Sequence, residues 1–208
     1  MSDVLEKDTV ESFSLGLEKW MHVSDVMEDM KTIYVLLTDT KTLFNRLSTK
    51  VTKQNYNHIS LIIDNNLDEI YTFSLSNGVN IFGGFQVEDR EDLNGSRYRL
   101  YAVEVTEAAH LKLTNKISEY KENIANTSYS FKSLVNALFK TDIFDNEDES
   151  NMICSLFVLS MLTEAGVEGF DKKSVAKLRP NELIRSKKFR YVRRGTISTT
   201  MNVSIEWI

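Results

Sequence analysis

Cysteine and proline each occur only once in this sequence of 208 residues, and histidine occurs three times. A single cysteine cannot form a disulfide within the chain, so we expect a packed fold in a reducing compartment, the cytoplasm. The cysteine and the histidines show neither C-x2-C nor H-E-x-x-H spacing, which are patterns of metal ligands. We therefore expect no metal and no other cofactor.

Long hydrophobic runs are also missing. The longest, such as LFVLSML, fall well short of the roughly 20 apolar residues of a transmembrane helix, so no membrane span is expected. The first residues, MSDVLEKDTVESF, carry carboxylates where a signal peptide carries basic residues, which argues against secretion by that route. The formal net charge of −5 gives no general attraction to nucleic acid. With 42% hydrophobic residues, the composition is typical of a globular protein.

Local patterns divide the chain into an acidic helical leader, residues 1–30, and one domain, residues 31–208. Asparagines 65 and 66 join two strand-like runs and predict a hairpin. The runs that predict strands are TIYVLL, NHISLIID, IYTFSLS, RYRLYAVEV and the stretch after Phe189. The runs that predict helices are KTLFNRLSTKV, the segment opened by Glu107, SFKSLVNALF and Met152–Ala165. This order predicts an α+β fold with a mainly antiparallel sheet packed against helices.

The single cysteine, Cys154, lies in the first turn of the predicted helix Met152–Ala165, with Ser150 or Asn151 as its N-cap and Gly166 after its end. Unpaired amides and the helix dipole favour an anion at this position, and the thiolate is the reactive form of cysteine. The alternative is that Cys154 is a small hydrophobic core residue. Its position alone does not decide between these two interpretations.

A nucleophilic cysteine needs a base within hydrogen-bond reach. His22 lies in the leader, and His110 lies near the start of a charged helix, where we expect it to face solvent. His58 opens a strand on which it shares one face with Ser60, because side chains alternate along a strand. His58 is therefore the candidate base.

The third member of a site would hold the His58 ring in place. When the apolar faces of the two hairpin strands are joined, Thr72 or Ser74 falls on the same face as His58. Glu69 is a more usual partner for histidine, but it has the opposite parity and would need a bulge to reach the ring. We expect Thr72 to orient His58, ahead of Ser74 and Glu69.

The order of these segments resembles the circularly permuted branch of the NlpC-type papain-like cysteine peptidases and amidases. The segments that carry the resemblance are YNHISLIID, YTFS, GGF, a strand–helix unit and CSLFVLSMLTEAG, and they span roughly residues 31–194. In papain-like enzymes the cysteine helix normally precedes the histidine strand, whereas here His58 comes before Cys154. The resemblance implies a permuted papain-like core that brings the two together. Many members have a histidine or a carboxylate as the third residue, where this sequence has Thr72.

These residues and the resemblance predict a cysteine-dependent hydrolase or acyltransferase. His58 would take the thiol proton, and Cys154 would attack the carbonyl of a peptide, an amide or an acyl ester. The alternative is a non-catalytic binding module on the same fold that uses the basic stretch RSKKFRYVRRG, residues 185–195, for phosphates and bases. Charge runs are more often solvated faces, so we do not expect a nucleic-acid partner. The sequence fixes neither the acyl group nor the oligomeric state.

Overall fold

The computed structural model describes residues 29–40, 55–64, 69–75, 83–141, 149–167 and 180–198. The chain divides into two compact units, Met1–Met30 and Lys31–Ile208. The predicted leader lies almost wholly outside the described residues, as do the predicted helix KTLFNRLSTKV and the turn at residues 65 and 66.

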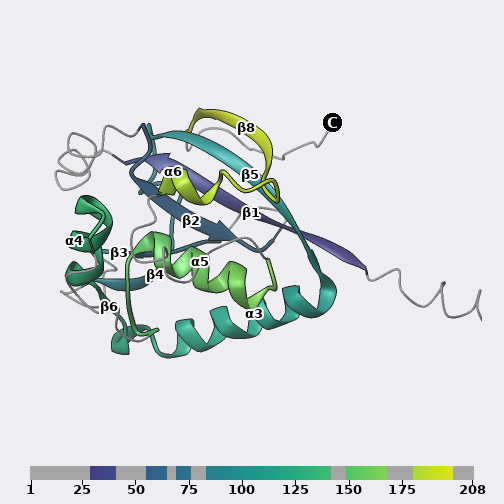
Figure 1. Cartoon of the computed structure of the whole chain (residues 1–208), viewed down its shortest axis with the longest axis horizontal. Helices are drawn as coiled ribbons and strands as arrows, with labels where there is room; N and C mark the ends of the chain where they lie inside the picture. Colours follow the sequence, from purple (N-terminus) through teal and green to yellow (C-terminus); the bar gives the residue numbers. More distant parts are fainter. Residues whose placement is uncertain are drawn as a thin grey trace, which may run out of the picture. The chain divides into compact units, whose positions relative to one another are not determined.

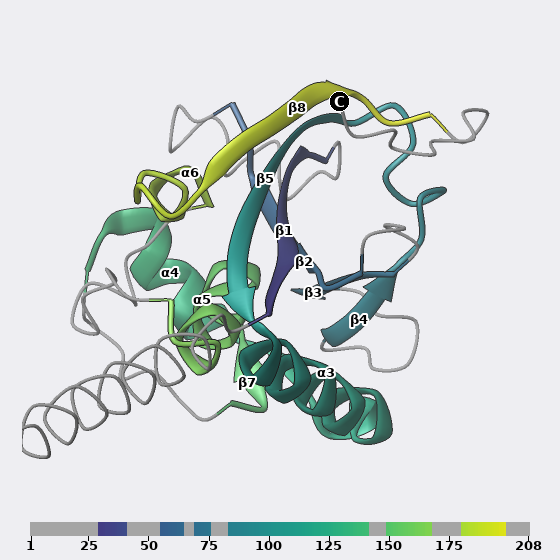
Figure 2. The same cartoon turned by 90° about the vertical axis from the view of Figure 1, so that its right-hand side faces the viewer.

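Six strands form one sheet in the order β4-β3-β2-β1-β5-β8. Their bounds are β1 Met30–Asp39, β2 His58–Ile62, β3 Ile70–Ser74, β4 Gly84–Glu88, β5 Arg97–Thr106 and β8 Arg190–Thr196. The neighbours β1–β2, β2–β3, β3–β4 and β5–β8 are antiparallel. Figure 2 shows β5 and β8 running side by side at one edge of the sheet.

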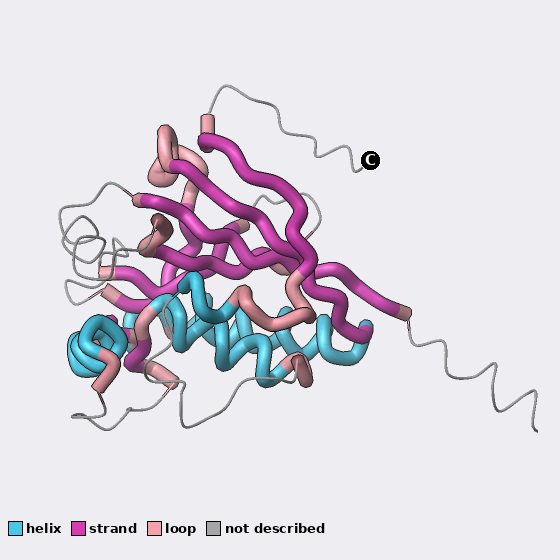
Figure 3. Tube along the Cα trace, turned by 45° about the horizontal axis from the view of Figure 1, so that its top comes forward, coloured by secondary structure: helices cyan, strands magenta, loops and turns pink. Residues whose placement is uncertain are grey.

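The helices gather on one side of this sheet (Figure 3). They are α3 Glu107–Glu122, α4 Phe131–Phe139, α5 Cys154–Glu164 and the short α6 Pro180–Leu183. The 3-10 turn η1 covers Ile124–Asn126. A separate two-stranded parallel sheet joins β6 Ser128–Tyr129 to β7 Asn151–Met152 (Figure 1). The predicted α+β fold is confirmed, and within the described residues no helix is long and apolar enough to cross a bilayer.

The main core lies between the sheet and the helices, on what we call the helix face of the sheet. Helix α5 packs across β2 and β3. Four buried rings meet there with centroids 5.1 to 6.0 Å apart, and these belong to Phe73, Phe85, Tyr120 and Phe157. The predicted stripe of α3 contributes to this core, since Leu113, Ile117 and Tyr120 are buried.

A smaller apolar cluster occupies the other side of the sheet, which we call the far face. Strand alternation places on it Tyr34, Leu36, Ile62, Ile70, Leu100 and Ala102, and Leu93 joins them from the turn between β4 and β5. Because both faces of the central strands are buried, all five residues of β2 are buried. The sheet therefore separates two apolar environments of unequal size.

The start of the cysteine helix differs from the prediction. Helix α5 begins at Cys154 and not at Met152, and its N-cap is Ile153, without a side-chain cap. Neither Ser150 nor Asn151 caps it, because Asn151 and Met152 are held extended by parallel pairing with Ser128 and Tyr129. The predicted left-handed glycine after the helix is confirmed, since Gly166 has φ +71°, but α5 ends at Glu164 and Ala165 is its C-cap.

Candidate active site

The candidate site centres on His58, the first residue of β2. The register pairs His58 with Thr38 and Ser60 with Leu36 across β1. Since Leu36 belongs to the far-face cluster, and cross-strand partners point to the same side, His58 and Ser60 share that face. Both side chains are buried.

The partner of the His58 ring is Glu88, at the end of β4. The Nε2 atom of His58 lies 2.7 Å from Oε1 of Glu88, and the two side chains are only 8% and 5% exposed. The Ser60 hydroxyl donates to the other carboxylate oxygen, Oε2, at 2.6 Å, and lies 3.3 Å from His58 Nε2. Both oxygens of the carboxylate therefore have partners, which fixes the plane of Glu88 against the ring.

Two glycines allow β4 to carry Glu88 to this position. Gly84, the first residue of β4, has φ +136°, a conformation that side chains rarely adopt. A Cβ atom on Gly84 would lie 2.4 Å from Oγ1 of Thr127, which accepts a hydrogen bond from the Phe85 amide. At Gly83, with φ +70°, a Cβ atom would lie 2.1 Å from the Ser74 carbonyl oxygen. The GGF segment thus lets β4 pass close to its neighbours.

Cys154 approaches the same ring from the start of α5. Its thiol belongs to the helix-face core, and its interaction with the His58 side chain raises the pKa of the ring. Because Glu88 occupies Nε2, the nitrogen left for the thiol is Nδ1. The Ile153 N-cap supplies no side-chain acceptor, so the first amides of α5 remain for an anion near the sulfur.

The electrostatics favour a charged histidine beside a charged carboxylate. Burial opposes protonation of His58, but the Glu88 charge, the hydrogen bond to Cys154 and the hydrogen bond to Glu88 raise its pKa well above 6.5. Burial likewise opposes ionisation of Glu88, yet the charge and hydrogen bond of His58 and the bonds from Ser60 and Gln86 lower the pKa of Glu88 below 4.5. We therefore describe the pair as imidazolium and carboxylate.

A tyrosine lies close to the thiol as well. The pairing of Tyr129 with Met152 in the small sheet brings the phenol to the segment that leads into α5. Burial, and then the Cys154 charge, raise the pKa of Tyr129 well above its ordinary value of 10.0. The phenol therefore keeps its proton near the sulfur at neutral pH.

The structure does not bring Thr72 to the His58 ring. Its buried hydroxyl donates to the Ile59 carbonyl at 2.9 Å, because Thr72 is held against the neighbouring strand β2. Ser74 donates to Oε1 of Gln86 at 3.0 Å. Glu69 pairs with Lys121 at 2.8 Å and also accepts from Tyr71. The third residue is Glu88, which lies one strand farther along the sheet than the hairpin.

Glu88 was not predicted from the sequence, because it lies outside the hairpin that supplied the candidates Thr72, Ser74 and Glu69. The available signal was GGF followed by a carboxylate, since a strand that starts at Gly84 places Glu88 four residues later. The register of β3 and β4 pairs Glu88 with Ile70, a far-face residue, so Glu88 shares its face with His58 and Ser60. No strand was predicted over this segment.

Other predicted residues lie away from the ring. His110 is partly buried rather than solvent-facing, and its Nε2 lies 2.8 Å from the Ile63 carbonyl oxygen. His22 lies outside the described residues. The basic stretch 185–195 ends in the exposed strand β8, where Arg190 pairs with Glu104 at 3.5 Å. In the part of the chain that the structure describes, no group of three or more His, Cys, Asp or Glu side chains is arranged to hold a metal ion.

No protein-family model matches this chain, and no curated protein matches it. The resemblance to permuted papain-like enzymes stays a prediction from the sequence. What supports a function is thus the arrangement of Cys154, His58 and Glu88.

Proposed function

We propose that the protein is a cysteine-dependent hydrolase or acyltransferase that acts on an amide or an ester. Cys154 is the nucleophile, His58 the general base and acid, and Glu88 the residue that orients and charges the ring. The observation that carries the proposal is the buried 2.7 Å pair of His58 and Glu88, in which the pKa of the ring is also raised by interaction with the only thiol of the chain.

A purely structural explanation accounts poorly for this pair. Burying two charges is expensive, and a buried ion pair is often no more stabilising than apolar residues of the same volume. Perturbed titratable groups that converge on a nucleophile are typical of active sites. If Cys154 were only a core residue, the desolvation cost of a charged His58–Glu88 pair beside it would have no functional explanation.

The proposed reaction is acyl transfer through sulfur. In the charged pair His58 already holds the thiol proton on Nδ1, so Cys154 attacks as the thiolate. Its sulfur forms a bond to the substrate carbonyl carbon while the C=O π electrons move to the oxygen. The oxyanion is held by first-turn amides of α5 and by the protonated Tyr129 phenol. His58 then gives its proton to the leaving amine or alcohol as the C–N or C–O bond breaks. Water or another acceptor, deprotonated by His58, releases the acyl group from Cys154.

An acyl-enzyme is the intermediate that this reaction requires. The full chain would be incubated with p-nitrophenyl butyrate, quenched in acid and measured by mass spectrometry. We expect one butyryl group on Cys154, none in Cys154→Ser, and strongly reduced labelling in His58→Ala. His110→Ala is the matched control and should label as wild type does. Labelling that survives in Cys154→Ser, or equal loss in both histidine variants, would refute the proposal.

A further inference from the structure

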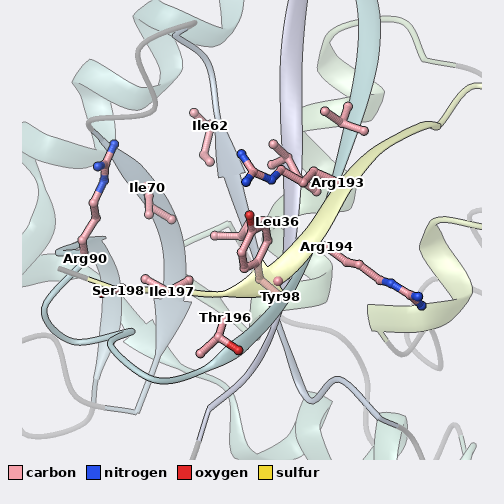
Figure 4. A pocket seen from close by; sticks show the side chains of 13 residues that line it. Leu36, Ile62, Ile70, Arg90, Tyr98, Arg193, Arg194, Thr196, Ile197 and Ser198 are labelled. Atoms are coloured by element: carbon pink, nitrogen blue, oxygen red, sulfur yellow. The ribbon is translucent and has the colours of Figure 1, made fainter. Parts of the chain in front are cut away.

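A cavity of about 290 Å³ opens on the far face of the sheet (Figure 4). We call it the sheet pocket, and its size is near the lower limit of cavities that bind small molecules. Its walls are mainly apolar side chains from five strands and the segment after β8, namely Leu36, Ile62, Ile70, Tyr98, Leu100, Val192 and Ile197. The Tyr98 ring lies against Gly195, where a Cβ atom would come within 3.1 Å of it.

The sheet pocket adjoins the His58–Glu88 pair. Leu36 lines the pocket and is the cross-strand partner of Ser60, the residue that donates to Glu88. Ile70 also lines the pocket and is the cross-strand partner of Glu88 itself. Cross-strand partners lie side by side on the same face of a sheet. Leu36 and Ile70 of the pocket therefore lie next to Ser60 and Glu88, the two residues that hold the His58 ring.

One cation of the pocket has no counter-ion in the described part of the chain. Arg193 pairs in register with Leu100, a far-face residue, and Figure 4 shows its guanidinium reaching over the cavity toward Ile62. The next residue, Arg194, pairs with Arg99, and its guanidinium points away from the cavity (Figure 4). Arg193 thus adds a positive charge to an apolar pocket, which suits a ligand with an apolar body and an anionic group.

We propose that the sheet pocket binds a small organic anion, with its apolar body between Leu36, Ile62 and Ile70 and its anionic group on Arg193. The pocket meets the proposed site only through Ser60 and Glu88, whereas Cys154 belongs to the core of the helix face, so the binding is argued independently of the proposed function. The binding itself does not require the thiol.

The probe is 4-phenylbutyrate, and 4-phenylbutan-1-ol is its uncharged counterpart with the same apolar body. Titration of the full chain, followed by methyl NMR, should shift Leu36, Ile62 and Ile70. The methyls of Ile59 and Leu61 are the internal control, because these residues lie on β2 like Ile62 but point to the helix face. Arg193→Gln should weaken binding of the acid about tenfold without changing that of the alcohol. Arg194→Gln, the matched control, should change neither by more than twofold.

The proposal is overturned if the shifts fall outside the pocket, if both arginine variants weaken the acid equally, or if the acid binds no better than the alcohol. Cys154→Ser should bind the acid as wild type does, so a failed acyl-enzyme experiment with intact binding refutes only the proposed function.

Discussion

The two faces of the sheet differ in what they bury. The helix face buries interlocked aromatic rings, of which Phe73 contacts three others and is fully buried. The far face buries a charged pair, His58 and Glu88, beside a cavity that is not filled by side chains. Dense apolar packing stabilises a fold strongly, whereas a buried charge pair is often no more stabilising than apolar residues of the same volume, and a cavity adds nothing. The comparison assigns stability mainly to the helix face and the buried charges to the far face, while the thiol of Cys154 comes from the helix-face core.

The largest expected effect comes from removing a ring on the helix face. Phe73→Ala should lower the free energy of unfolding by about 4 kcal/mol, because it leaves a cavity among the packed rings. Leu36→Ala, on the far face, should cost about 2 kcal/mol, since its side chain already borders a cavity. Chemical denaturation measures both. Equal losses would mean that the two faces contribute alike to stability.

The next effect concerns the strand that carries Glu88. Gly84→Ala places a Cβ atom against Thr127 at a φ of +136°, so we expect a loss of about 3 kcal/mol in unfolding free energy. Displacement of β4 should also slow alkylation of Cys154. Gly166→Ala is the control, because it also has positive φ but no atom within 4 Å of the added Cβ. If Gly84→Ala keeps full thiol reactivity, β4 does not position the site.

The charge pair should give a pH-dependent contribution to stability. The Glu88 pKa is lowered from 4.5, so its contribution is present above pH 4.5 and is lost as the pH falls through the folded value. The His58 pKa is raised above 6.5, so its contribution is present below pH 6.5 and is lost as the pH rises through the folded value. The unfolding free energy of wild type should therefore exceed that of Glu88→Gln by the largest amount, about 2 kcal/mol, between about pH 4.5 and 6.5. Denaturation at several pH values measures this difference, and a pH-independent difference would argue against a charged pair.

The smallest effect is expected at the residue that the sequence suggested as the third member. Thr72→Val removes the hydrogen bond to the Ile59 carbonyl and should lower the unfolding free energy by about 1 kcal/mol. Alkylation of Cys154 should not change, because the Thr72 hydroxyl does not contact His58. A large fall in the alkylation rate with an intact fold would show instead that Thr72 orients His58.

Strands and helices whose apolar residues recur with a clear period could be predicted from the sequence. The β-branched run of β1, the hairpin strands β2 and β3, and the stripe of α3 follow directly from apolar spacing. The start of α5 was not predictable in this way, because its boundary depends on pairing between Met152 and Tyr129, which are distant in sequence. Helix propensity alone continues the helix to Met152.

The candidate site shows the same limit. Cys154 and His58 could be proposed from local context, since one opens a helix and the other opens a strand. Glu88 could not be assigned from the hairpin register, because its contact with His58 requires the position of a fourth strand. The sheet pocket depends on β5 and β8 as well, and Arg193 differs from Arg194 only through the register with Leu100. Long-range strand order decides these features.

The central claim is that Glu88, through His58, activates Cys154. Its most direct test is the second-order rate constant for alkylation of Cys154 by iodoacetamide at pH 7, measured in wild type, Glu88→Gln and Glu69→Gln. We expect Glu88→Gln to react about tenfold more slowly or worse, because loss of the carboxylate weakens the imidazolium that stabilises the thiolate. Glu69→Gln, which removes an exposed pair with Lys121, should react within twofold of wild type. Equal rates for Glu88→Gln and wild type would contradict the account.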